Sequence, residues 1–202
     1  GDAVTIDYKN ASGETANCTT IVGDFVASNV DLIMANGTTA LQSAMAATSS
    51  IPILGTSITE YGVALGIDGF TGTSGTSDLA PLDQQAAMLQ EWFPDAQTVG
   101  LLYCSAEPNS QYQVDTVQGY LEQAGITCTQ YSFSDSNDLS AVATTACTES
   151  DVVYIPTDNT AATNAELIGN IALNAGTPII AGEEGICSGC GVATLTISYY
   201  DI

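Results

Sequence analysis

Histidine is absent from this chain of 202 residues, and arginine is absent as well, so Lys9 is the only basic residue. The lack of histidine excludes Ser-His-Asp and Cys-His nucleophile pairs and His-ligated zinc sites. The lack of arginine excludes the bidentate clamp that often holds carboxylates and phosphates. We therefore expect no enzyme, no cofactor and no metal site, and an enzyme that uses a pair of carboxylates stays as an alternative.

Acidic charge is plentiful by comparison, since 23 aspartates and glutamates give a formal net charge of -22. Only 12% of the residues are charged, whereas about 25% is typical, so the imbalance comes from missing bases rather than extra acids. A surface of this sign repels nucleic acids, anionic membranes and phosphate ligands. We expect no nucleic-acid partner.

Long apolar runs are also missing, because no stretch approaches the roughly 20 residues that a membrane-spanning helix needs. No signal peptide precedes the first strand-like segment, VTIDY at 4–8, so the sequence is expected to be a mature protein or a fragment. With 45% hydrophobic residues the chain is globular, and its length suits one α/β domain or two smaller lobes.

Cysteines are present, and buried thiols with a structural role are the favoured interpretation. They lie at positions 18, 104, 128, 147, 187 and 190. Cys128 and Cys147 flank one strand–helix unit, so a disulfide between them is left open. Cys187 and Cys190 form a close pair, CSGC, which lies between glycines and is interpreted as a tight turn, with redox chemistry as the alternative.

Short apolar runs alternate with segments of helical periodicity along the chain. Strands are predicted at 4–8, 30–35, 51–54, 98–104, 126–133, 151–156, 178–182 and 192–197. Helices are predicted around 18–25, 38–47, 82–93, 114–124, 138–146 and 161–174. This alternation predicts an α/β fold with parallel sheets and helices on both faces.

The stretch GTSGTSDLAP at 72–81 has the composition of a linker. The strand–helix patterns before and after it are each self-contained, so two α/β lobes joined here are predicted. Gly72 and Gly75 suit a crossing that has to bend, with an inert loop as the alternative. Ser77 or Asp78 is expected to cap the helix that follows.

Turns that follow strands are the candidate sites, because ligands of open α/β sheets bind at the carboxyl ends of the strands. The small, polar turns of this kind are ANGTT at 35–39, CSAEPNS at 104–110, PTDNT at 156–160 and GEEG at 182–185. Their backbone N–H and hydroxyl groups suit a ligand carboxylate, whereas Glu107, Asp158 and Glu183 suit an ammonium group. Together these groups describe a site for a zwitterion such as an amino acid.

Helix capping is the competing interpretation of the same residues. Ser, Thr, Asp and Asn before a helix are ordinary N-caps, and for any single turn capping is the more common role. Several turns of this character at one sheet edge favour a shared binding cleft.

These turns belong to motifs that are specific in type and order: VDLIMANGTTA, GTSDLAPLDQQ, LYCSAEPNSQYQV, VYIPTDNTAA, AGEEGICSGCGVATL and the final SYYDI. In them, and over nearly its whole length, the sequence resembles substrate-binding proteins of ABC importers, in the subgroup for tryptophan or aromatic amino-acid uptake. The resemblance implies a type I periplasmic-binding-protein fold, whose two Rossmann-like lobes close on a small solute and deliver it to an ABC permease. It also implies an extracytoplasmic location, as a periplasmic protein or a lipoprotein.

Site residues follow from the same motifs. The resemblance implies ligand contacts by Asn36, Thr38, Thr39, Ser105, Glu107, Asn109, Ser110, Asp158, Asn159, Thr160 and Glu183. It implies a hinge that includes Gly72, Gly75, Ser77, Asp78 and Tyr199.

The resemblance also sets the expected domains. They are a first lobe at 1–77, a second lobe at 78–197 and a return crossing at 198–202. Family members usually have a further strand and helix before VTIDY and more elements after YYDI, so the first lobe is expected to be incomplete at both chain ends. A ligand-sensing extracellular domain of a receptor on the same fold is the alternative function.

Overall fold

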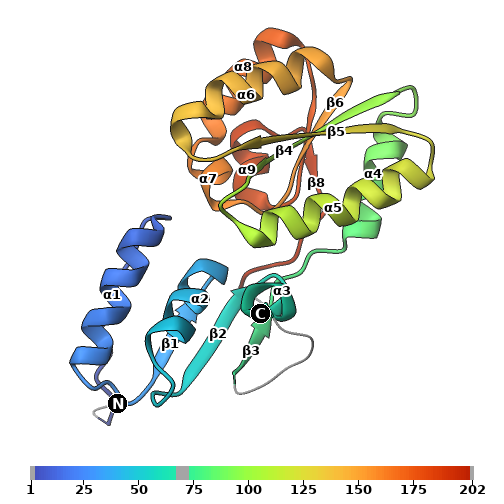
Figure 1. Cartoon of the computed structure of the whole chain (residues 1–202). Coiled ribbons are helices and arrows are strands. Elements are labelled where there is room, and N and C mark those ends of the chain that lie inside the picture. The colour runs from blue at the N-terminus through green and yellow to red at the C-terminus, as the bar shows by residue number, and fades with distance from the viewer. Residues whose placement is uncertain (1–2, 67–72, 201–202) are drawn as a thin grey trace.

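Two parallel sheets organise the protein, which a computed structural model describes over residues 3–66 and 73–200 (Figure 1). The 3-stranded sheet has the order β1-β2-β3. Its strands are β1 (Ile33–Asn36), β2 (Ile53–Ile58) and β3 (Ser74–Ser77), and its helices are α1 (Thr15–Ala27), α2 (Thr38–Ala47) and α3 (Tyr61–Leu65). We call the part of the chain from α1 to β3 the first lobe.

The second lobe, from α4 to β8, is built on a 5-stranded sheet of order β5-β4-β6-β7-β8. Its strands are β4 (Thr98–Cys104), β5 (Thr127–Phe133), β6 (Val152–Ile155), β7 (Ile179–Ala181) and β8 (Ala193–Thr194). Its helices are α4 (Leu82–Trp92), α5 (Pro108–Gln123), α6 (Ser136–Glu149), α7 (Asn159–Thr163), α8 (Ala165–Ala175) and α9 (Glu184–Cys190).

Helices cover both faces of the second sheet. Side chains alternate along a strand, so Leu102 and Cys104 of β4 pack with α6 and α8 on one face. Leu101 and Tyr103 of the same strand pack with α4 and α5 on the other face. A strand that is buried on both sides needs a continuous apolar run, and TVGLLYC supplies one.

The first sheet is covered on one face within the described chain. Ile33 and Ala35 of β1 are buried against α1 and α2. Met34, which points to the opposite face, is 70% exposed, and Leu54 of β2 is 40% exposed.

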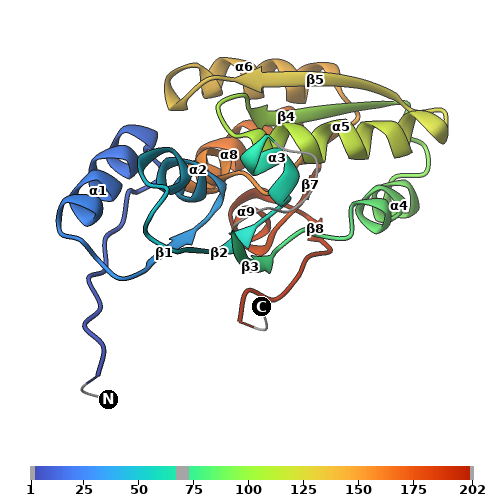
Figure 2. The same cartoon turned by 60° about the horizontal axis from the view of Figure 1, so that its bottom comes forward.

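Two segments join the lobes, and both views show them passing between the sheets (Figure 1 and Figure 2). The first runs from β3 to α4, and the second leaves β8 and passes near β3. All strands up to Ser77 lie in one sheet and all strands from Thr98 lie in the other. The domain boundaries at residues 77 and 197 stay predictions.

The predicted strands and helices of the second lobe are largely confirmed, and so is the α/β class with parallel sheets. The predicted strand at 4–8 is wrong. Val4, Ile6 and Tyr8 are 75%, 83% and 80% exposed, and the segment pairs with no strand of the described chain. An alternating apolar pattern becomes a strand only where a neighbouring strand supplies hydrogen-bond partners.

Two local predictions after residue 160 are also wrong. The helix expected at 161–174 is broken at Asn164 into α7 and α8, and the Asn164 side chain donates to the carbonyl oxygen of Thr160. The CSGC segment is the end of α9 rather than a tight turn, because Glu183 caps that helix and outweighs the weak helix propensity of its glycines. The strand expected at 192–197 is ordered as β8 only over Ala193–Thr194.

All six cysteines lie in the described part of the chain and are free thiols, so the disulfide left open between Cys128 and Cys147 is absent here. Burial raises the pKa of Cys128 to about 11 and that of Cys190 to about 12, which disfavours the reactive thiolate form. None of the described helices combines the length and the apolar character that crossing a membrane requires.

Candidate functional site

The turns after β4 and β6 lie side by side, because these two strands pair in parallel. Glu107, in the turn after β4, is 6% exposed and points to the start of α7. Its carboxylate accepts 2.9 Å hydrogen bonds from the backbone N–H and side-chain amide of Asn159 and from the backbone N–H and hydroxyl of Thr160. Glu107 therefore caps a helix that begins about fifty residues further along the chain.

Asp158, in the turn after β6, makes the reciprocal connection. Its carboxylate accepts hydrogen bonds from the backbone N–H of Cys104 at 2.7 Å and of Ala161 at 2.8 Å. Burial, and then the neighbouring Glu107 carboxylate, raise the pKa of Asp158 to about 7. Through these hydrogen bonds the two acids hold the turns after β4 and β6 together.

The carbonyl oxygen of Thr157 also connects these two turns. The side chains of Asn109, Ser110 and Gln113 donate to it at 3.1, 3.1 and 3.2 Å. These three side chains are buried on the first turns of α5, so they fix the position of the turn after β6.

Glu183, in the turn after β7, also caps a helix. Its carboxylate accepts hydrogen bonds from the backbone N–H groups of Gly185, at 2.7 Å, and Ile186. The acids that the sequence matched to a ligand ammonium group, Glu107, Asp158 and Glu183, are thus all engaged at helix N-termini. Ser105, by contrast, is exposed at this edge, and its hydroxyl donates to the Phe133 carbonyl oxygen at 3.2 Å.

At the corresponding edge of the first lobe Glu60 caps α3, whereas α2 has no side-chain cap. Asn36 ends β1 and is exposed, whereas Thr38 and Thr39 form the first turn of α2 and are buried and half-buried. The N-cap residue of α2 is Gly37, and no side chain of the described residues caps this helix. Its first backbone N–H groups therefore remain available to an anion.

The segment predicted as a hinge is partly a strand. Gly75 and Ser77 belong to β3, and a Cβ on Gly75 would lie 1.8 Å from the Gly55 carbonyl oxygen, so close strand packing requires this glycine. The Ser77 hydroxyl donates to the Thr59 carbonyl oxygen and accepts from the Leu79 N–H. The expectation that Ser77 or Asp78 caps α4 is wrong, because the N-cap residue of α4 is Pro81 and no described side chain caps this helix. Gly72 lies outside the described residues.

Asp78 and Tyr199 bring the two crossings together. The Tyr199 side chain is within hydrogen-bonding reach of the Asp78 carboxylate and of the Thr157 side chain. The Asp78 backbone N–H donates to the Ile58 carbonyl oxygen at 3.1 Å, beside the carboxyl end of β2. The carboxyl ends of β2 and β6, from different lobes, therefore meet around this pair.

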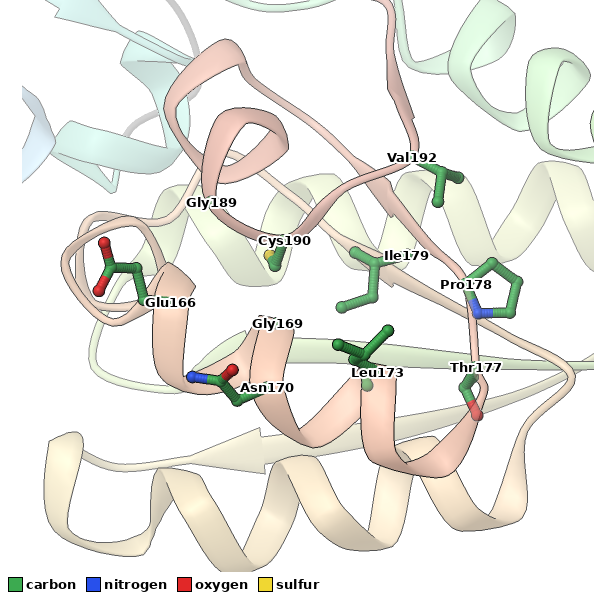
Figure 3. A pocket seen from close by; sticks show the side chains of 11 residues that line it. Glu166, Gly169, Asn170, Leu173, Thr177, Pro178, Ile179, Gly189, Cys190 and Val192 are labelled. Carbon is green, nitrogen blue, oxygen red and sulfur yellow. The ribbon is translucent and has the colours of Figure 1, made fainter.

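A hollow of about 510 Å³ lies elsewhere on the second lobe (Figure 3). It is bordered by Leu173 of α8, Cys190 of α9, and Pro178 and Val192. Pro178 and Val192 precede β7 and β8, so this hollow is at the amino ends of those strands. It is separate from the predicted site residues, which lie at the carboxyl ends. No set of side chains suited to a metal ion occurs in the described ranges.

The sequence model of the family described as ABC transporter substrate binding protein matches residues 1–202. The chain belongs to this family. Its description names a binding role, in agreement with the expectation, drawn from the missing histidine and arginine, that the protein is not an enzyme.

Among curated proteins, the tyrosine-binding protein of Clostridioides difficile (strain R20291) is 32% identical to this chain over 203 residues. The match covers 98% of this chain and 59% of that protein, so the chain spans about three fifths of this relative's length.

Similar solved structures confirm the fold. The ABC domain from Streptococcus pneumonia in complex with L-Trp is 27% identical with a TM-score of 0.93, over 98% of this chain and 70% of that one. The ligand-free, open structure of a substrate binding protein with adhesive properties from Clostridium difficile is 32% identical with a TM-score of 0.64, over 100% and 70%. The lobes of this chain are therefore arranged more like those of the L-Trp complex, despite its lower identity.

Two buried glutamines of this region were not predicted from the sequence. The Gln85 amide donates to the carbonyl oxygens of Gly182 and Leu195, and its oxygen accepts from the Tyr154 hydroxyl. Gln113 both donates to and accepts from the backbone of Thr157. A glutamine on a helix gives no sign of such a role, since most glutamines lie on the surface.

Proposed function

We propose that the protein is an extracytoplasmic solute-binding protein of an ABC importer, and that it binds an aromatic amino acid between its lobes. The observation that carries the proposal is the arrangement of the lobes, which matches the L-Trp complex with a TM-score of 0.93 in a chain whose whole length fits the family. The name of the tyrosine-binding relative supports the same class of ligand.

The ligand carboxylate binds at the first lobe in this proposal. The uncapped start of α2 offers backbone N–H groups, and Thr38 and Thr39 add hydroxyls beside the amide of Asn36. Such a helix N-terminus can hold an anion without a basic side chain, which suits a chain that has one lysine and no arginine.

The second lobe contributes a rigid wall in this proposal. Ser105, Asn159 and Thr160 lie at the edge that faces the first lobe, as candidate contacts for the ligand. Glu107, Asp158, Asn109, Ser110 and Glu183 act by holding the turns that carry or neighbour those contacts. Because the ligand touches both lobes at once, it stabilises the closed arrangement over an open one.

Delivery completes the proposed role. The closed protein presents the amino acid to an ABC permease, and the protein acts outside the cytoplasm, in the periplasm or as a membrane-anchored lipoprotein. These two points rest on the family alone.

Titration of the natural protein with amino acids tests this function. We expect L-tyrosine or L-tryptophan to raise the melting temperature, with a gain of about 2.7 kcal/mol in unfolding free energy when the ligand is at 100 times its Kd. The methyl ester of the same amino acid serves as the matched control. It lacks the negative charge that α2 is proposed to hold, and it should bind at least about tenfold more weakly.

The contrary results are equally clear. A protein whose melting temperature no amino acid changes does not have the proposed function. Equal affinity for the amino acid and its methyl ester would show that α2 does not bind the ligand carboxylate. It would leave the proposed specificity for amino acids standing.

A further inference from the structure

Four acidic side chains within residues 3–66 and 73–200 are buried, and each needs compensation for the water that it has lost. They are Asp78, Glu107, Asp158 and Glu183, with exposed fractions of 5%, 6%, 1% and 9%. Glu107, Asp158 and Glu183 each accept at least two backbone N–H groups at the start of a helix or the end of a strand. Those three carboxylates are structural, because the protein itself satisfies them.

Asp78 differs from the other three. Its Oδ1 atom is buried and has no hydrogen-bond partner within residues 3–66 and 73–200. The hydroxyl groups of Thr59 and Tyr199 lie within hydrogen-bonding reach of the carboxylate, yet burial outweighs them and raises the pKa of Asp78. A buried carboxylate oxygen without a donor requires an explanation, and a ligand group that donates to it is one.

The chain has almost no cation to offer to Asp78. Its single basic side chain, Lys9, lies 3.4 Å from Asp7 in the extended N-terminal segment and is half-exposed there. The partner of the Asp78 carboxylate is therefore expected to be a bound molecule rather than another side chain.

The position of Asp78 fits a ligand that contacts both lobes. Asp78 follows β3 and is hydrogen-bonded to the end of β2 through the Ile58 carbonyl oxygen. Its neighbour Tyr199 reaches Thr157, in the turn after β6 of the second lobe. Asp78 thus lies where the carboxyl edges of the two sheets meet.

We propose that Asp78 accepts the ammonium group of the bound amino acid. This inference rests on the proposed function and adds the residue that binds the amine of the ligand. A primary ammonium group has three N–H donors, so it can satisfy the open oxygen of Asp78 and still bond to neighbouring hydroxyls. The site then prefers free amino acids to analogues without the amine, because those leave the buried carboxylate unpaired.

The test compares the natural protein with the D78N variant, using L-tyrosine and its desamino analogue, which is the same molecule without the ammonium group. We expect the wild-type protein to prefer L-tyrosine by about 10- to 100-fold, and D78N to lose most of that preference by binding L-tyrosine more weakly. D78N without ligand should melt at the same temperature as the wild type or higher, since a buried unpaired charge is removed. The D31N variant, which changes the same charge at an exposed position, is the matched control and should retain the wild-type preference.

Each other outcome has a distinct meaning. Unchanged preference in D78N overturns the role of Asp78 and leaves the proposed function standing. Equal weakening for both compounds, together with a lower melting temperature, assigns Asp78 a structural role and also overturns it. A wild-type protein that binds no amino acid overturns the proposed function and this inference together.

Discussion

The two lobes share the same strand–helix pattern but differ in how their sheets are covered and in how their helices are capped. The second sheet is covered on both faces, and the helices that start at its carboxyl edge after β6 and β7 are capped by acidic side chains. The first sheet is covered on one face of the described chain, and α2 starts at its carboxyl edge without a side-chain cap. The contrast is not uniform, because α5 of the second lobe also starts without a side-chain cap, whereas Glu60 caps α3 of the first lobe. The uncapped start of α2 keeps N–H groups that an anion can use.

The largest expected effect tests the difference in packing. Leu101 of β4 is fully buried between the sheet and its helices, whereas Leu54 of β2 is 40% exposed. We expect Leu101→Ala to lower the unfolding free energy by about 3 kcal/mol and Leu54→Ala by less than about 1 kcal/mol. Urea unfolding followed by circular dichroism measures both, and similar losses would show that the first sheet is covered in solution.

The second prediction concerns the caps. Glu107 accepts several hydrogen bonds from Asn159 and Thr160, whereas Glu60, at the start of α3, accepts one from Val63 at 2.6 Å. Glu107→Ala should cost about 2 kcal/mol of unfolding free energy, and Glu60→Ala about 0.5 to 1 kcal/mol.

Ligand affinity separates capping from ligand contact in the same variant. Folded Glu107→Ala protein should bind L-tyrosine with nearly the wild-type Kd if its carboxylate serves only α7. A loss of affinity of more than about tenfold, under conditions where the variant is fully folded, would indicate that Glu107 contacts the ligand.

The smallest expected effect is a pH dependence that the second lobe carries. Burial and the Glu107 carboxylate raise the pKa of Asp158 from 3.8 to about 7, so the folded state holds this proton more tightly than the unfolded chain. The contribution to stability is complete below about pH 4 and is lost as the pH rises through about 7. We expect the unfolding free energy to fall between about pH 5 and pH 8, as the folded state releases this proton.

A variant isolates this contribution from the general charge repulsion of an acidic chain. Asp158→Asn should be less stable throughout but should show a flatter pH profile, because the titrating group is gone. Asp31→Asn, with the same change in net charge, should keep the wild-type slope. Identical slopes in all three proteins would assign the pH dependence to the overall charge.

Sequence reasoning predicted the second lobe well because its information is local. The apolar run of β4 and the glycine after α5 identify those elements without knowledge of the rest of the fold. Prediction failed at 4–8 and at CSGC, where the outcome depends on distant groups: a partner strand in the first case and the Glu183 cap in the second.

The candidate site shows the same limit. The rule that strand ends gather at one sheet edge located the polar turns from the sequence. Whether a carboxylate there is satisfied or open depends on which N–H groups fold against it, and Glu107 finds its donors 52 and 53 residues away. Asp78 looked like part of a linker, and nothing in its sequence neighbourhood indicates an oxygen without a donor.

Gln85 has a mechanical consequence. By holding the carbonyl oxygens of Gly182 and Leu195, it fixes the first residues after β8 to the second lobe. Ser77, through its bonds to Thr59 and Leu79, fixes the other crossing to the first lobe as far as residue 79. We therefore expect any rotation of one lobe against the other to be absorbed within residues 79–81 and 196–199.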